Sequence, residues 1–320
     1  MALRAAAAAA AGTDADAGAA TDTDADAGAQ PDAAAPRTPF VPSARTLDLG
    51  GRRHDLTHRA LVMGILNRTP DSFYDKGATF ELDKLYTRAE QLVADGADIL
   101  DIGGVKAGPG PEVTEPEELD RVVPVVAGLV ARFDTPVSVD TWRASVARAS
   151  YAEGAVMGND ISGLADPDYA PAAAEHGAAV VITHIRLKPR VADPDPHYDD
   201  VVTEVAAFLT ERAGQTRAAG VPSERIVLDA GLDLGKTAEQ SLTLLRASPH
   251  LASLGFPLLL SASNKTFLGK TLDLEITERG AASIGAAALG ITWGCRIVRV
   301  HDVLGTCRAR DALAAVSEAR

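Results

Sequence analysis

From Leu61 to the C-terminus, short β-rich aliphatic segments alternate with segments of helical periodicity. This alternation constrains the fold more than any other feature of the chain. The eight strand candidates are residues 61–67, 98–104, 136–141, 156–161, 179–184, 226–231, 257–263 and 296–302. The helix candidates are residues 83–94, 115–131, 143–152, 199–219, 238–246 and 277–289, with a short helix before Gly177.

Strands that are apolar on both faces are typical of a parallel sheet covered by helices. Eight β/α units over about 250 residues are the usual size of a closed barrel. The sequence therefore predicts an α/β protein built as a single (β/α)8 barrel, the TIM-barrel architecture. An open doubly wound sheet is the alternative, but it would favour a glycine-rich turn after the first strand, where residues 67–70 read NRTP.

The first 45 residues are almost entirely Ala, Asp, Gly, Thr and Pro, a composition that cannot bury enough apolar surface to offset the entropy lost on ordering. We predict a disordered tail over residues 1–45 and a barrel domain over residues 46–320. No signal peptide or membrane-spanning stretch is evident, so a cytoplasmic protein without a membrane partner is expected. A net charge of −13 without a basic cluster argues against a nucleic-acid partner.

Polar residues stand at the end of every strand candidate and would meet at the C-terminal face of a barrel, where a ligand pocket is expected. They are Asn67, Asp101, Asp140, Asn159, Asp160, His184, Asp229, Ser263, Lys265, Arg299 and His301. Asp and Asn at such junctions also serve as helix caps. Lys265, Arg299 and His301 are poor caps and indicate an anionic ligand such as a phosphate at one rim. Carboxylates at the opposite rim would suit a heterocycle that presents N–H donors.

The acidic residues Asp101, Asp140 and Asp229 allow a second interpretation, a metal cage. None of these three acids belongs to an HxH, HExxH or DxD spacing that would support it. One Asn beside a bound diphosphate is enough to hold a Mg²⁺ ion that keeps most of its waters.

Five segments carry a family resemblance. Residues 63–73 read MGILNRTPDSF, and the others are DIGG at 101–104, SVDT at 138–141, NDIS at 159–162 and RVHDV at 299–303. In order and spacing they resemble the signature segments of dihydropteroate synthases, and the resemblance covers residues 46–320.

The resemblance implies that p-aminobenzoate condenses with 6-hydroxymethyl-7,8-dihydropterin diphosphate, with Mg²⁺ assisting, to give 7,8-dihydropteroate and diphosphate. A homodimer is also implied. The pterin would be held by Asp140, Asn159, Asp229 and Lys265, with Asp101 nearby. The diphosphate would be held by Asn67, Arg299 and His301, with Asn67 also a metal ligand. Asp75, Lys265, Arg299 and His301 are the expected catalytic residues, and Phe73 would contact the aromatic amine.

The chain departs from the family pattern in loop two. Active members typically read GGESTRPG where residues 103–110 read GGVKAGPG, and the Arg of their SRK motif is replaced by Asn264. The positions that the resemblance assigns to pterin and diphosphate survive, whereas most of the altered positions are ones that the resemblance assigns to p-aminobenzoate and loop closure. In this respect the chain resembles the second, divergent paralogue of actinobacteria.

Three functions are therefore compatible with the sequence. The first is the synthase. The second is a paralogue that binds pterin diphosphate with weak, lost or altered synthase activity. The third, least favoured because the TPDSF loop and the RVH segment suit a diphosphate, is a methyltransferase of the wider pterin-binding superfamily.

Overall fold

Eight parallel strands close into a barrel in the order β10-β3-β4-β5-β6-β7-β8-β9. The computed structural model describes residues 46–67 and 78–319. The barrel strands are β3 (Leu61–Asn67), β4 (Ile99–Gly103), β5 (Val137–Asp140), β6 (Met157–Asp160), β7 (Ala179–Thr183), β8 (Ile226–Asp229), β9 (Leu258–Leu260) and β10 (Cys295–Val300). Each strand lies inside its predicted segment or within one residue of it, which confirms the predicted (β/α)8 barrel. The predicted tail, residues 1–45, and the predicted site residues Phe73 and Asp75 lie outside the described residues.

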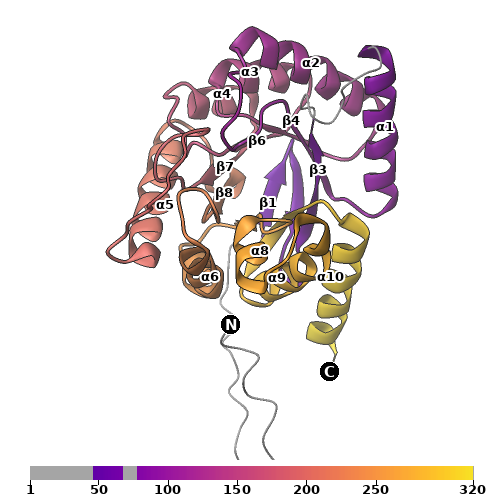
Figure 1. Cartoon of the computed structure of the whole chain (residues 1–320). Coiled ribbons are helices and arrows are strands. Elements are labelled where there is room, and N and C mark those ends of the chain that lie inside the picture. Colours follow the sequence, from indigo (N-terminus) through magenta and orange to yellow (C-terminus); the bar gives the residue numbers. More distant parts are fainter. Residues whose placement is uncertain (1–45, 68–77, 320) are drawn as a thin grey trace, which may run out of the picture. The chain divides into compact units, whose positions relative to one another are not determined.

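Helices connect the strands and lie outside the barrel (Figure 1). They are α1 (Ala78–Ala94), α2 (Glu115–Arg132), α3 (Ala144–Ala152), α4 (Tyr169–His176), α5 (Val201–Ala218), α6 (Ala238–Arg246), α7 (Ser248–Ala252), α8 (Thr266–Leu272), α9 (Gly280–Thr292) and α10 (Val303–Glu318), with 3-10 turns η2 (Ser223–Arg225) and η3 (Ile276–Glu278). Helices α7, α8 and α10 were not predicted from the sequence. Of the described helices, none is long and apolar enough to cross a membrane.

The start of α10 shows why it escaped prediction. Gly305 and Thr306 occupy its first turn, and both are poor helix formers. Asp302 compensates as the N-cap, because its Oδ1 accepts the Gly305 N–H at 2.9 Å.

A two-stranded hairpin precedes the barrel and was also not predicted. Its strands, β1 (Thr46–Leu49) and β2 (Arg52–Asp55), pair antiparallel across Gly50 and Gly51, which have φ values of +60° and +83°. A Gly-Gly pair between two short segments is a hairpin signal that could have identified it. Leu47 is fully buried in one cluster with apolar residues from the barrel interior, so the hairpin packs on the N-terminal end of the barrel.

The interior of the barrel changes from apolar to polar along the strands. Side chains two residues apart on a strand point to the same face. The inward pairs that show the change are Ile99 and Asp101 on β4, Met157 and Asn159 on β6, Val227 and Asp229 on β8, and Ile297 and Arg299 on β10. The first residue of each pair packs in the apolar cluster above the hairpin. The second residue therefore faces the C-terminal end, where the polar site lies.

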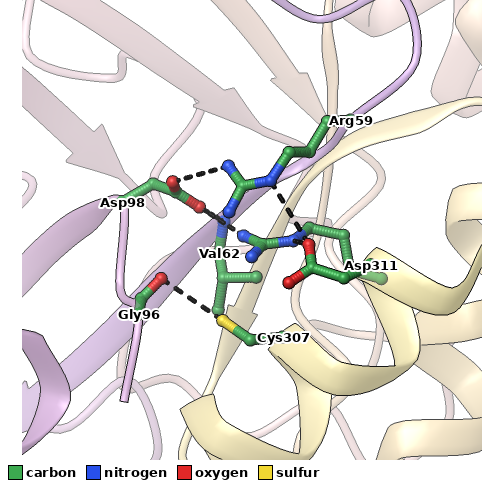
Figure 2. A network of polar contacts seen from close by, with 7 residues as sticks. Arg59, Val62, Gly96, Asp98, Cys307 and Asp311 are labelled. Atoms are coloured by element: carbon green, nitrogen blue, oxygen red, sulfur yellow. Dashed lines mark hydrogen bonds and ion pairs between the residues drawn. The ribbon is translucent and has the colours of Figure 1, made fainter. Parts of the chain in front are cut away.

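An ion-pair network binds α10 to the rest of the barrel, as Figure 2 shows for its labelled members. Asp98 accepts the Val62 N–H at 2.8 Å and an N–H of Arg59 at 3.0 Å. Arg310 of α10, which is 2% exposed, donates to Asp98 at 2.6 Å and to Asp311 at 2.8 Å. The network joins the segment before β3, the start of β4 and the last helix.

Candidate functional site

Arg299 lies at the centre of the polar end of the barrel and contacts two carboxylates. Its Nε donates to Asp101 Oδ2 at 2.6 Å and its Nη2 donates to Asp140 Oδ2 at 2.7 Å. Burial opposes the charge of Arg299, but Asp101 and Asp140 outweigh that effect and raise its pKa. The expectation that cations and carboxylates occupy opposite rims is therefore wrong, because the barrel is narrow enough for the arginine of β10 to reach both β4 and β5.

Asp140 is an unusual carboxylate. Burial raises its pKa to about 7, although Arg299 acts to lower it and Asp101 acts to raise it. Near neutral pH, Asp140 is therefore divided between a carboxylate that accepts hydrogen bonds and an acid that can also donate one.

The folded-state pKa of Asp140 predicts how stability depends on pH. Because this pKa is about 7 and the ordinary value is 3.8, the folded chain binds the proton more tightly than the unfolded chain. The stability that Asp140 contributes to the folded chain is fully present below about pH 4 and is lost as the pH rises through 7. Urea unfolding between pH 4 and 8 should show a smaller loss of stability with rising pH in Asp140→Asn than in the unaltered chain. Parallel pH profiles for the two proteins would contradict this assignment.

Asn159, on β6, joins the hydrogen-bonded set of Arg299, Asp101 and Asp140. It is 3% exposed, and its Nδ2 donates to Asp101 Oδ2 at 3.2 Å. Asp101 Oδ1, Ser138 Oγ and Thr183 Oγ1 are buried and have no hydrogen-bond partner within the described part of the chain. Buried polar atoms are normally hydrogen-bonded, so these inward-facing groups favour a polar ligand or water. The sequence analysis missed Ser138 and Thr183, although Ser138 stands two residues before Asp140 and period-two alternation could have found it.

Asp229 and Lys265 form the opposite side of the site. Asp229 is 5% exposed and accepts the Gly231 N–H at 2.7 Å. Burial raises the pKa of Asp229, whereas the charge of Lys265 acts to lower it. Lys265 donates to Leu232 O at 2.6 Å, and its own pKa is lowered by burial. An acid and an amine held in this way can recognise a ligand that has adjacent donors and acceptors.

His301 follows β10 and is held as a neutral imidazole. Its Nδ1 lies 2.9 Å from Ser263 Oγ, and its backbone oxygen accepts an N–H of Arg88 at 2.9 Å. Burial and then the charge of Arg299 lower its pKa to about 4. At neutral pH it therefore supplies one N–H donor and no positive charge. Asn67 ends β3 with an exposed side chain.

Two other strand-end residues serve the loops around the site. His184 Nδ1 lies 2.9 Å from Lys236 Nζ, and Lys236 also donates to Gly231 O at 2.9 Å and to Leu234 O at 3.1 Å. Burial lowers the pKa of Lys236 to about 7. Asp160 accepts the backbone N–H groups of two residues in its own loop, at 2.5 and 2.9 Å. Asp160 thus binds the turn that follows its own strand and caps no helix, since α4 begins only at Tyr169.

Comparison with known proteins gives a family match over most of the barrel. Residues 63–301 match the family described as "Pterin binding enzyme". The chain is 42% identical over 273 residues to the dihydropteroate synthase of Synechocystis sp., which covers 83% of this chain and 94% of the relative. It is equally 42% identical over 268 residues to the inactive dihydropteroate synthase 2 of Mycobacterium tuberculosis, covering 82% of this chain and 84% of that relative.

Solved structures of similar proteins have the same architecture. Xanthomonas albilineans dihydropteroate synthase with 4-aminobenzoic acid superposes with a TM-score of 0.80 at 38% identity, covering 87% of this chain and 100% of that chain. The same organism's enzyme in complex with 7,8-dihydropteroate gives a TM-score of 0.76 at 36% identity with the same coverage.

Proposed function

Because this chain belongs to the dihydropteroate synthase family of pterin-binding enzymes, we propose that it condenses p-aminobenzoate with 6-hydroxymethyl-7,8-dihydropterin diphosphate. The products are 7,8-dihydropteroate and diphosphate. The observation that carries the proposal is a set of four residues joined by hydrogen bonds at the barrel mouth, in which Asp101 and Asn159 are buried and Asp140 and Arg299 are partly buried. The similar structures that hold 4-aminobenzoic acid or 7,8-dihydropteroate support the choice of substrates.

The pterin ring is assigned to Asp140, Asn159, Asp229 and Lys265. An aminopyrimidinone presents adjacent N–H donors and a carbonyl acceptor, which match carboxylates on one side and amide or ammonium groups on the other. Asp229 is buried at the end of β8, Lys265 is partly buried just before α8, and each acts on the pKa of the other. This pairing supports a fixed orientation of the ring.

The diphosphate is assigned to Arg299, His301 and Asn67. A guanidinium carries five N–H donors, and the contacts with Asp101 and Asp140 use two of them, so Arg299 can hold both acids and still donate to an anion. Neutral His301 adds one N–H. These groups would stabilise the negative charge that develops on the leaving diphosphate, the contribution that usually dominates such sites. For the residues outside the described ranges, the catalytic role of Asp75 and the contact of Phe73 with the aromatic amine remain predictions.

Mg²⁺ is proposed as the metal, with Asn67 as its protein ligand. Among the described residues no group of three His, Cys, Asp or Glu could form a cage. The exposed Asn67 amide fits an ion that is coordinated mainly by diphosphate oxygens and water. When bound, Mg²⁺ would neutralise part of the diphosphate charge.

Loop two supports a second candidate function. Residues 103–110 read GGVKAGPG and lack the Ser-Thr-Arg core typical of active members. A relative named an inactive dihydropteroate synthase 2 is as similar to this chain as the Synechocystis synthase is. The alternative is therefore a protein that binds pterin diphosphate with weak, lost or altered synthase activity.

A single-turnover experiment with the full chain separates the two candidates. Release of diphosphate from the pterin diphosphate would be measured with Mg²⁺, with and without p-aminobenzoate, while 7,8-dihydropteroate is followed chromatographically. Formation of 7,8-dihydropteroate supports the synthase. Tight pterin diphosphate binding without that product supports the paralogue and refutes the synthase.

A homodimer is part of the proposal. Neighbouring helices α9 and α10 carry exposed apolar side chains, Leu289 at 47%, Leu304 at 40% and Val316 at 75% exposure. We therefore place the proposed interface on these two helices, since exposed apolar side chains are what a protein interface covers. Light scattering after gel filtration would test the mass. The cytoplasmic location remains a prediction from the sequence.

A further inference from the structure

The loop between β4 and α2, residues 104–114, borders the site. It leaves the barrel at Gly103, where an added Cβ would lie 3.3 Å from Asp140 Cβ. We call residues 104–114 the β4–α2 loop. Any ligand group that extends out of the barrel past Asp140 therefore meets this loop.

Arginines from three different elements bind the carbonyl groups of the β4–α2 loop. Arg121 of α2 donates to Gly104 O at 3.1 Å, and Arg143 before α3 donates to Val113 O at 2.8 Å. Arg190 donates from Nη1 to Lys106 O at 3.0 Å and from Nη2 to the carbonyl of Pro111. Both ends and the middle of the loop are therefore held.

Of these three arginines, Arg190 comes from another loop of the barrel mouth, the one between β7 and α5. Its backbone N–H donates to Ala107 O at 3.0 Å, and its φ of +67° is an uncommon conformation for a residue other than glycine. In the same loop, Arg186 binds Asp193 through two contacts of 2.5 and 2.9 Å. These contacts hold Arg190 in place from its own side.

Arg143 is connected to the site strand. It forms an ion pair with Glu118, which is fully buried and also accepts the Thr141 hydroxyl at 2.6 Å. Thr141 directly follows Asp140. The end of the β4–α2 loop is thus tied to the strand that carries a predicted pterin ligand.

Cavities lie on both sides of the Arg190 guanidinium. One, of about 220 Å³, is lined by residues 107–109 together with parts of 185–193 and 233–236. The other, of about 210 Å³, is lined mainly by the β4–α2 loop itself and by Arg121. Arg190 and Pro109 line both cavities. The middle of the loop therefore borders open space on two sides of Pro109, and the Arg190 contacts help to hold it there.

The hydrogen bonds that Arg190 donates to the loop all go to backbone carbonyl groups. They therefore do not depend on which side chains the loop carries. Such hydrogen bonds remain available to a loop that lacks a Ser-Thr-Arg core. We propose that Arg190 is a positioning residue that orders the β4–α2 loop before substrate binds and so preforms the wall of the p-aminobenzoate subsite. Preordering removes an entropy cost from binding. The inference rests on the proposed function for the identity of that substrate.

The test compares Arg190→Met with Arg217→Met, which removes an exposed arginine on α5. In Arg190→Met we expect faster hydrogen exchange at residues 104–113 in the ligand-free chain and a KM for p-aminobenzoate about 10–100-fold higher. The Kd for pterin diphosphate and kcat should change less than about twofold. Arg190→Lys keeps the charge but cannot donate two hydrogen bonds from one planar group, so its exchange rate and KM should lie between those of Arg190→Met and the unaltered chain.

A second pair of variants keeps Arg190 and alters its neighbour. A Cβ at Gly110 would lie 3.1 Å from Arg190 Nη2, whereas a Cβ at Gly108 would have no atom within 4 Å. Gly110→Ala should therefore speed exchange in the loop and Gly108→Ala should not.

Unchanged exchange in both Arg190→Met and Gly110→Ala would overturn the proposal, as would an unchanged KM in Arg190→Met. If the unaltered chain makes no 7,8-dihydropteroate, the proposed function fails by itself. The exchange measurement still decides whether Arg190 orders the loop, because it needs no turnover.

Discussion

Replacing Arg299 with methionine should lower kcat/KM for 7,8-dihydropteroate formation by about 10³-fold, equivalent to ~4 kcal/mol. The physical reason is twofold. The variant loses the cation assigned to the diphosphate, and it leaves Asp101 and Asp140 as adjacent carboxylates without the guanidinium that contacts both. Steady-state kinetics over a range of pterin diphosphate concentrations would measure the effect.

The same variant should also change stability in a pH-dependent way. Arg299 acts to lower the pKa of Asp140, so its removal raises that pKa further above the unfolded value of 3.8. The folded variant then holds the proton to higher pH, so its loss of stability relative to the unaltered chain should grow as the pH rises above about 7, where Asp140 of the unaltered chain ionises. Arg299→Lys, which retains a charge but not the fork, is the matched control and should be less destabilised. Full activity in Arg299→Met would refute the assignment.

Arg310→Met should destabilise the fold by about 3 kcal/mol while leaving KM and kcat of the folded protein unchanged. Arg310 is 2% exposed and joins Asp98 to Asp311, so its removal takes a buried partner from Asp98, whose side chain is only 19% exposed, and from the more exposed Asp311. Methionine retains most of the packing of the arginine stem. Urea unfolding monitored by circular dichroism would measure the difference.

The control for Arg310 lies in the same network. Arg59 contacts the same two carboxylates, at 3.0 and 3.3 Å, but its side chain is 46% exposed (Figure 2). Exposed ion pairs contribute little, so Arg59→Met should cost less than about 1 kcal/mol. Equal losses in Arg59→Met and Arg310→Met would show that burial does not decide the strength of this network.

Most of the barrel could be predicted because its local patterns agree with its tertiary structure. The strand-end residues Asp101, Asp140 and Arg299 were found for the same reason, since parallel strands in a closed barrel must bring their C-terminal ends together. The roles of neighbouring strand ends could not be separated in this way. Asp160 caps its own loop and His184 contacts Lys236, although in sequence both look like Asp140.

The sequence by itself determined the order of the barrel's elements and the residues gathered at its mouth, because hydrophobic periodicity and strand direction are local properties of the chain. The tertiary structure alone decided which of those residues touch. Arg299 and Asp101 are 198 residues apart in the chain, and Arg310 and Asp98 are 212 apart. No local pattern reports such pairs, because they depend on how a closed sheet brings distant side chains within hydrogen-bonding reach. The hydrogen bonds from Arg190 to the β4–α2 loop could not be predicted for the same reason. Every residue has a backbone carbonyl, so only the fold decides which carbonyl groups lie next to Arg190.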